Sequence, residues 1–272
     1  MRFAERGIQS IQSPDDPRIA EADRRSPVVV ALELSEHADL DELRFREEVE
    51  PYENGLEAAL GFCTRKNVLP YLDNVLEQTG VRPAGTVVEL GAGSCWLSAA
   101  MACLPEVERV VAIEFSERRL RTIPPASIAL LDAPAEKIER RVADFYASGL
   151  EPGSADLVLT DAAFHHAADP VRLGRVAFDL LRPGGQFLLL REPTLAALRR
   201  TRDHGIEGQH GHFEHEYHHR EYVDLLRQAG FEARALPVRW FYTEWWRKVF
   251  YRPFAVPIAY LRGSFVYLGT RP

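Results

Sequence analysis

The stretch VVELGAGSCWLS, residues 87–98, contains the pattern on which the fold prediction rests. An apolar, strand-like run is followed by two glycines, Gly91 and Gly93, and then by the start of a helix-like segment. Many α/β folds bind nucleotides with such a turn, because the free N–H groups of the first helical turn face the ligand. We therefore expect a ligand at this glycine turn.

Two residues near the glycines narrow the chemistry of that ligand. A dinucleotide-binding turn has a third glycine, three residues after the second, so that helix and strand pack closely around a pyrophosphate. That position holds the bulky Trp96, which disfavours a pyrophosphate. Glu89, at the end of the predicted strand, would repel a phosphate but suits a positively charged ammonium group.

Two further acids stand where the next predicted strands end. Glu114 ends RVVAIEF, residues 109–115, and Asp144 ends a later strand and precedes Phe145. Glu114 can accept hydrogen bonds from both ribose hydroxyls. Asp144 can accept a hydrogen bond from the adenine amino group while the Phe145 ring covers the adenine face. Because these strand ends line one crevice in an open α/β sheet, the ligand that fits is a nucleoside with a positive tail and no phosphate.

Strand-like and helix-like segments alternate around the turn. The predicted strands are apolar on both faces, which is typical of a parallel sheet covered by helices on both sides. We expect the helix that starts near residue 117 to be stopped by Pro124 and Pro125. Two more strands are expected in residues 232–242 and 264–272, after an amphipathic helix that ends at Gly230.

The predicted organisation has three parts. Residues 1–80 form an N-terminal arm and a helical lid segment, and the arm, residues 1–26, is either mobile or ordered only on the domain surface. Residues 81–192 form a Rossmann-like, cofactor-binding core. Residues 193–272 supply an acceptor loop, a late helix and the last strands of the same domain.

Charge and cysteine usage limit the class of protein. The formal net charge is −7, which argues against duplex nucleic acid as a partner. The three cysteines, Cys63, Cys95 and Cys103, form no CxxC pair, so we expect a reducing compartment and no structural zinc. The charged N-terminus lacks a signal-peptide core, and no run approaches the ~20 apolar residues of a membrane span. We therefore expect a cytoplasmic location.

Five motifs in order resemble those of the class I S-adenosylmethionine (SAM)-dependent methyltransferases: VVELGAGSCWLS, VVAIEF, VADFY, SADLVLTDAAFHHAADP and LRPGGQFLLL. The resemblance covers residues 86–190 and implies SAM as cofactor. It implies an α/β, Rossmann-like open sheet, mostly parallel with an antiparallel last strand and helices on both faces. Cys95 replaces the last glycine of the family's first motif. The cofactor-binding residues expected from the motifs are Glu89, Gly91, Gly93, Ser94, Glu114, Phe115, Asp144, Phe145 and Asp161.

Candidate catalytic residues follow the predicted strand at 155–160. His165 and His166 lie where the resembling family holds the cofactor's methyl group, and histidine has a pKa suited to removing a proton. Either histidine is expected to act as the base or only to shape the pocket. Asp161 is a second candidate base, with capping the turn or closing the adenosine pocket as its alternative role.

The predicted function is SAM-dependent O-methylation of a small molecule, a saccharide or a secondary metabolite, by in-line methyl transfer. The alternatives are a nicotinamide-dependent oxidoreductase and a non-catalytic regulator that binds SAM. A histidine cluster is interpreted as a polar acceptor loop rather than a metal site; its members are His204, His210, His212, His215, His218 and His219. The aromatic segment 244–261 is expected to pack on its own core or form a homodimer contact, and a lipid-linked acceptor or a peripheral membrane surface is the alternative.

Overall fold

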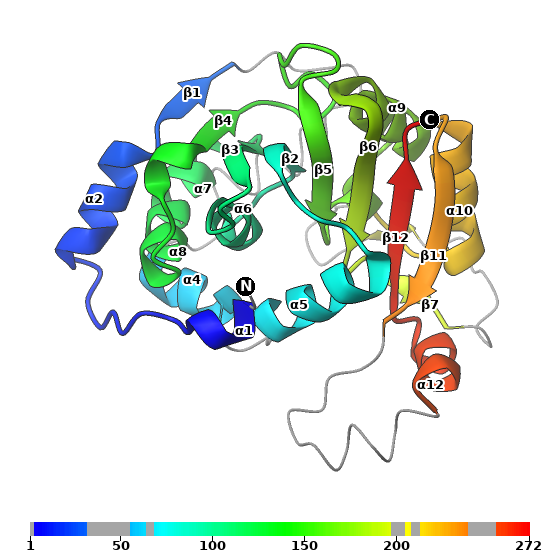
Figure 1. Ribbon diagram of the computed structural model, residues 1–272, viewed down its shortest axis with the longest axis horizontal. Coiled ribbons are helices and arrows are strands. Elements are labelled where there is room, and N and C mark those ends of the chain that lie inside the picture. The colour runs from blue at the N-terminus through cyan, green and yellow to red at the C-terminus, as the bar shows by residue number, and fades with distance from the viewer. Residues whose placement is uncertain (1–2, 32–54, 64–67, 197–204, 208–212, 239–253) are drawn as a thin grey trace.

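The computed structural model describes residues 3–31, 55–63, 68–196, 205–207, 213–238 and 254–272. An eight-stranded sheet with the order β1-β4-β3-β2-β5-β6-β12-β11 forms its centre (Figure 1). Six neighbouring strands are parallel: β1 (Val28–Val30), β4 (Ile138–Val142), β3 (Val107–Glu114), β2 (Gly85–Leu90), β5 (Ala155–Asp161) and β6 (Leu181–Leu190). The predicted parallel sheet is confirmed.

The last strand of the chain, β12 (Phe265–Thr270), runs antiparallel to β6. The edge strand β11 (Glu232–Pro237) pairs antiparallel with β12. The expected antiparallel last strand is therefore confirmed as well. Four short strands form two small separate sheets: β7 (Thr194–Leu195) pairs with β10 (Tyr217–His218), and β8 (Gly205–Glu207) pairs with β9 (Phe213–His215).

Helices cover both faces of the sheet because successive strand residues point to opposite sides. Val87 belongs to one hydrophobic cluster, with α4 (Gly55–Cys63), α5 (Val68–Thr79), α6 (Trp96–Ala102) and α8 (Pro124–Leu130). Val88 belongs to another, with α9 (Pro170–Leu180) and α10 (His219–Gln228). Figure 1 shows the first group, in cyan and green, on the other side of the sheet from α9 and α10.

The N-terminal arm is ordered on the domain surface, which was the second of the two expectations. It contains α1 (Phe3–Arg6) and α2 (Pro17–Arg25), and the side chain of Phe3 is buried. Arg140 of β4 is buried under the arm; its guanidinium donates to the Asp23 carboxylate at 2.7 Å and to the Ser26 carbonyl. This charge-assisted contact attaches the end of α2 and the start of β1 to the sheet.

The prediction that Pro124 and Pro125 only stop a helix was incomplete. The helix α7 (Glu117–Thr122) does end before them, but α8 begins at Pro124. Proline fits the first turn of a helix because the N–H group that it lacks would have no partner there. In the predicted N-terminal helical segment, α4 and α5 are confirmed, and residues 32–54 and 64–67 lie outside the described residues.

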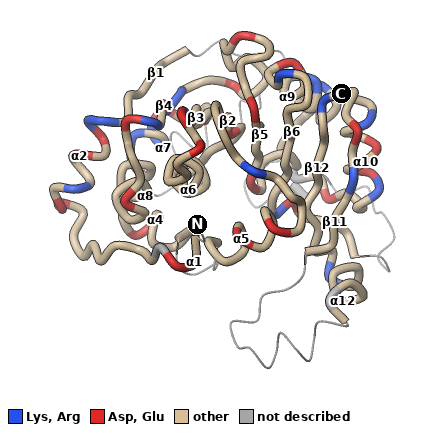
Figure 2. The backbone as a smooth tube through the Cα atoms, in the orientation of Figure 1, with Lys and Arg blue, Asp and Glu red and all other residues tan. Residues whose placement is uncertain are grey.

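Acidic and basic residues are interspersed along the exposed helices. Figure 2 shows both signs on α2 and on α10. Neither of these two helices presents the continuous basic face that duplex binding requires. The helix α12 (Ala255–Arg262) differs, since Val256, Tyr260 and Leu261 are exposed large apolar residues.

Candidate active site

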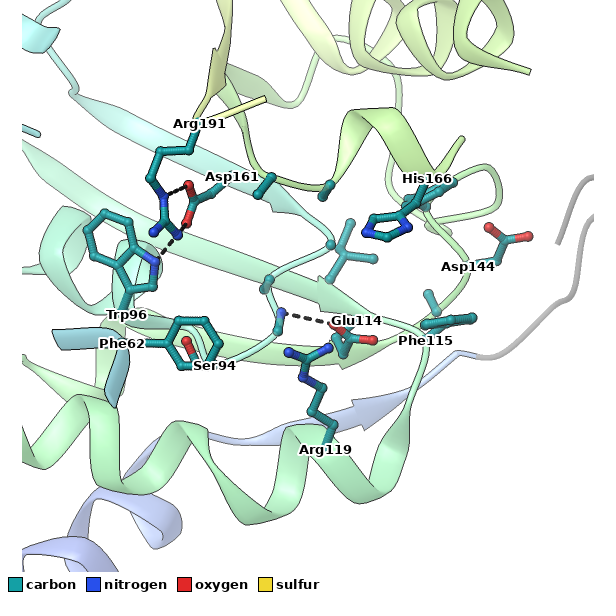
Figure 3. A pocket seen from close by; sticks show the side chains of 18 residues that line it. Phe62, Ser94, Trp96, Glu114, Phe115, Arg119, Asp144, Asp161, His166 and Arg191 are labelled. Atoms are coloured by element: carbon teal, nitrogen blue, oxygen red, sulfur yellow. Dashed lines mark hydrogen bonds and ion pairs between the residues drawn. The ribbon is translucent and has the colours of Figure 1, made fainter. Parts of the chain in front are cut away.

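A cavity opens where the parallel strands end (Figure 3). Its wall is built by the segments that follow β2, β3, β4, β5 and β6, together with Phe62 of α4. Except for Glu89, all of the predicted cofactor-binding residues line this cavity. The carboxyl ends of neighbouring parallel strands share one edge of a sheet, which is why residues far apart in the chain meet here.

The glycine turn between β2 and α6 forms one side of the cavity. Gly91 and Gly93 have φ angles of +74° and +51°, a region that side chains rarely adopt. A Cβ atom added to Gly91 would lie 2.7 Å from the Cβ atom of Ala163 across the cavity edge. The turn therefore needs glycine both for its backbone conformation and for the close approach of the next wall segment.

Cys95 occupies the position where the family motif ends in glycine. Its φ of 54° and ψ of 21° are left-handed, and it caps the start of α6 without a side-chain hydrogen bond. The side chain is fully buried among Ala92, Ala112 and Leu120. Burial raises the pKa of the Cys95 thiol, so the sulfur stays neutral. The apolar packing gives Cys95 a physical role that the sequence did not reveal.

The carboxylate of Glu114 is held beside the turn. It accepts a hydrogen bond from the N–H of Gly93 at 2.9 Å (Figure 3). It accepts another from the N–H of Ser116 at 3.2 Å. Asp144, on the segment after β4, accepts from the N–H of Tyr146 at 3.0 Å. Phe115 and Phe145 follow these two acids and also line the cavity, so each acid has an aromatic neighbour.

The prediction that Glu89 contacts the ligand requires correction. Its side chain is buried, and one carboxylate oxygen accepts hydrogen bonds from the N–H of Ser98, at 2.8 Å, and from the Ser98 hydroxyl. Burial raises the pKa of Glu89 to about 8, which favours the uncharged form at neutral pH. Glu89 thus binds the first turn of α6 through Ser98, does not line the cavity and does not offer a negative charge to it.

Asp161 is part of a three-residue cluster at the other end of the cavity. Its carboxylate accepts hydrogen bonds from the indole N–H of Trp96 at 2.7 Å and from Nε of Arg191 at 2.6 Å, and it forms an ion pair with the Arg191 guanidinium (Figure 3). Both oxygens of the Asp161 carboxylate are thus engaged by groups of the protein. The geometry favours the alternative role of Asp161, closing the pocket.

Sequence reasoning missed Arg191 and considered Trp96 only as a bulky replacement for glycine. Arg191 follows β6 directly and has a φ of 51°, so its backbone turns sharply at the strand end. The one available signal was its place after QFLLL, at the same sheet edge as the predicted acids. Arg119 of α7 was missed too, although it also lines the cavity.

The two candidate histidines have different positions. His166 lines the cavity, whereas His165 does not, and the His165 Nδ1 atom lies 2.8 Å from Oε2 of Glu192. The two rings pack against each other with centroids 4.1 Å apart. The structure therefore leaves His166 as the histidine of the predicted pair that can meet a ligand.

A protein-family model described as a methyltransferase domain matches residues 88–189. These residues are a methyltransferase domain, and its motifs are those of the class I SAM-dependent methyltransferases. The family excludes the nicotinamide-dependent oxidoreductase that the sequence left as an alternative.

Known proteins resemble this methyltransferase over different lengths. A Streptomyces fradiae protein described as an uncharacterized 37.1 kDa protein in transposon TN4556 is 30% identical over 124 residues, which are 45% of this chain and 34% of that protein. The chain thus aligns with about a third of the length of this curated relative.

Solved structures share the fold at low identity. One is a chain from a Haloferax volcanii complex of the Trm112 methyltransferase activator with a methyltransferase; its TM-score is 0.59 at 17% identity, covering 88% of this chain and 100% of that chain. Another is a Haemonchus contortus phosphoethanolamine N-methyltransferase 2 with SAM, with a TM-score of 0.58 at 12% identity, covering 86% of this chain and 60% of that chain. At these identities the likeness shows the fold of the methyltransferase.

The histidine cluster of this methyltransferase is described in part. His215 stacks on Tyr217, and His219 stacks on Phe265 with ring centroids 4.8 Å apart. His204, His210 and His212 lie outside the described residues, as does most of the aromatic segment 244–261. Within the described part of the chain, no group of three potential metal ligands occurs, and no helix is long and apolar enough to cross a membrane.

Proposed function

We propose that this methyltransferase transfers the methyl group of SAM to an oxygen atom of a small-molecule acceptor, a saccharide or a secondary metabolite. One observation supports the proposal above the others. A single cavity brings together the glycine turn, the acids Glu114 and Asp144, and the imidazole of His166 (Figure 3). The glycine turn and the two acids suit binding of a nucleoside, and the imidazole suits removal of a proton from the acceptor.

The residues of the cavity fit SAM as a group. Gly91 and Gly93 have positive φ angles, and a Cβ atom on either would crowd Ala163 or Arg119 at the edge of the cavity. Glu114 would accept hydrogen bonds from the ribose hydroxyls, and Asp144 would accept one from the adenine amino group. Phe115 and Phe145 would cover the adenine face, as aromatic rings do for flat ligands.

The far end of the cavity suits the amino acid part of SAM. Arg191 lines the wall there, and its positive charge suits the methionine carboxylate. The Asp161 ion pair and the Trp96 ring hold the guanidinium, so its position does not depend on the ligand. Phe62 of α4 closes part of the same cavity and shields it from water.

When bound, SAM supplies a methyl group on a positively charged sulfur, which leaves as a thioether when the acceptor oxygen takes the methyl. The chain's part is to orient the acceptor and to take up its hydroxyl proton. We propose that His166, which lines the cavity, takes up this proton, because imidazole accepts protons near neutral pH. Because Asp161 is paired with Arg191, we assign to it the closing of the pocket instead.

Calorimetry with S-adenosylhomocysteine, SAM and NAD tests the cofactor part of the proposal. We expect both adenosyl ligands to bind and NAD to fail, because Trp96 stands where a pyrophosphate turn needs glycine. Absence of binding by both adenosyl ligands would overturn the proposal. A panel of hydroxylated acceptors, followed by mass spectrometry for a gain of one methyl group, tests the transfer. Binding without turnover on any acceptor would favour the non-catalytic regulator.

A further inference from the structure

Glu192 is the second residue after β6, and its side chain is wholly buried. Its carboxylate is surrounded by donors from one turn. Oε1 accepts from the N–H groups of Ala163, at 3.2 Å, and Phe164, at 3.0 Å. Oε2 accepts from the N–H of His165 at 3.2 Å and contacts the ring of the same residue at 2.8 Å. A fifth contact comes from the Thr160 hydroxyl at 3.3 Å.

The three backbone donors belong to residues 163–165, at the start of the short helix η3 (Phe164–His166), where the first N–H groups have no partners within the helix, whereas Thr160 lies on β5. One buried carboxylate satisfies them together, and hydrogen bonds to a charged acceptor are stronger than those between neutral groups. Neutralising Glu192 while its size is kept would therefore weaken several bonds to the turn at once.

The turn held by Glu192 forms one wall of the cavity. His166 is at its end, and Ala163 at its beginning packs against the Gly91 turn, where an added Cβ would come within 2.7 Å. The ring of His165, bound to Glu192, packs on the ring of His166 at 4.1 Å. A chain of contacts thus leads from the buried carboxylate through His165 to the imidazole that faces the cavity.

We propose that Glu192 is a positioning residue for methyl transfer: it fixes the turn at residues 163–166 and, through His165, the orientation of the His166 ring. The inference rests on the proposed role of His166 as proton acceptor. Glu192 does not line the cavity that holds His166, whose wall is formed by the turn in front of it; it lines a second hollow, with Thr194 and Gly263. When His165 is neutral, a proton on Nδ1 shared with Glu192 leaves its Nε2 unprotonated.

The kinetic test is Glu192→Gln, which keeps the size of the side chain and removes its charge. We expect kcat to fall about tenfold or more, while KM for SAM and Kd for S-adenosylhomocysteine change less than about threefold, because Glu114, Asp144 and the glycines are untouched. Glu232→Gln, an exposed position at the start of β11, is the matched control. An unchanged kcat in folded Glu192→Gln, or an equal loss of cofactor affinity, would overturn the inference.

A second variant covers the case in which Glu192→Gln fails to fold. His165→Phe keeps a ring against His166 and the backbone N–H bonds to Glu192, but it removes the bond from the ring to the carboxylate. We expect kcat to fall about threefold to tenfold with cofactor affinity retained. If folded His165→Phe has the kcat of the wild type, the claim that Glu192 orients His166 through His165 is wrong.

A spectroscopic measurement separates this inference from the proposed function. Nitrogen NMR of the histidine side chains reports which ring nitrogen carries the proton, and it needs no acceptor. We expect the wild-type protein to show His165 protonated on Nδ1, and Glu192→Gln to change the His165 and His166 signals but not those of His219. Identical spectra would overturn the inference even if methyl transfer is found. If no transfer is found, the proposed function fails and these spectra still decide the role of Glu192 in holding the histidine pair.

Discussion

Arg191 lies over the ring of Trp96, with its Cζ atom 5.4 Å from the ring centroid, and both side chains donate hydrogen bonds to the carboxylate of Asp161. The contact joins the end of β6 to the first residue of α6 and closes one end of the cavity. A guanidinium stacked on an aromatic ring and paired with a carboxylate has little freedom to move. The cation is therefore in place before any ligand arrives.

Asp161→Asn removes the charge that pairs with Arg191. Because the remaining guanidinium is mostly buried, we expect a loss of about 2 kcal/mol in the free energy of unfolding and weaker binding of S-adenosylhomocysteine. Urea denaturation and calorimetry measure the two effects. Asp224→Asn on the exposed face of α10 is the matched control. Unchanged stability and affinity in Asp161→Asn would show that the cluster does not hold the wall.

Glu114→Ala removes the carboxylate expected to bind the ribose hydroxyls. Two charge-assisted hydrogen bonds are lost, each worth about 1.5 to 3 kcal/mol, so we expect the Kd for S-adenosylhomocysteine to rise about a hundredfold or more. Calorimetry measures this change directly. Glu139→Ala, a carboxylate on the neighbouring strand and away from the cavity, is the control. A Kd equal to that of the wild type would remove Glu114 from the cofactor site.

His166→Ala should separate turnover from binding. We expect kcat to fall about a hundredfold, as is typical when a general base is removed, with the Kd for S-adenosylhomocysteine nearly unchanged. The measurement requires an acceptor from the panel and a binding assay on the same preparation. If His166→Ala and Glu114→Ala lose cofactor affinity equally, the proposed division between proton acceptor and cofactor-binding acid is wrong.

Glu89 makes the stability of the protein depend on pH. Its pKa is raised to about 8 in the folded state from an ordinary value of 4.5. Between these values the folded protein keeps a proton that the unfolded chain releases, so this group's contribution to stability falls as pH rises from 4.5 to 8.

Glu89→Gln should remove this fall while keeping an oxygen that accepts from Ser98. We expect the slope of unfolding free energy between pH 5.5 and 7.5 to become flatter by up to about 1.4 kcal/mol per pH unit. Urea denaturation across this range measures it, with Glu108→Gln at an exposed position as control. If the unfolding free energies of the wild type and Glu89→Gln change equally with pH, the raised pKa of Glu89 is contradicted.

Cys95 combines an unfavourable backbone conformation with favourable packing. Cys95→Gly would relieve about 1 to 2 kcal/mol of left-handed strain and lose a similar amount from the cavity left by the sulfur. We therefore expect its unfolding free energy to stay within about 1 kcal/mol of the wild type. Cys95→Val should lose about 2 kcal/mol, because a β-branched side chain is strongly disfavoured at positive φ. Equal stability of the Gly and Val variants would argue against strain at this position.

The order of the elements followed from local patterns. Two-faced apolar strands, such as those containing Val88 and Val158, predicted a parallel sheet because helices must cover both of its sides. Part of the cavity followed from the same reasoning. Glu114 ends β3 and Asp144 follows the end of β4, and the ends of neighbouring parallel strands meet at one edge of the sheet.

Other features needed the packed molecule. Glu89 also ends a strand, yet its side chain turns toward Ser98 and away from the cavity. The partners in the Trp96–Asp161 contact are 65 residues apart, and those in the Glu192–His165 contact are 27 residues apart. The direction of a buried polar side chain depends on which donors surround it after folding. The periodicity of the sequence does not predict these partners.

The sequence by itself therefore determined the sheet, the glycine turn and the acids at the strand ends, because these depend on local conformation and on strand direction. Only the tertiary structure decided that His166 faces the cavity while His165 binds Glu192, and that Arg191 is held by Asp161 and Trp96. Those arrangements arise from the need of buried polar groups for partners, and the partners are brought close only when the whole sheet has formed.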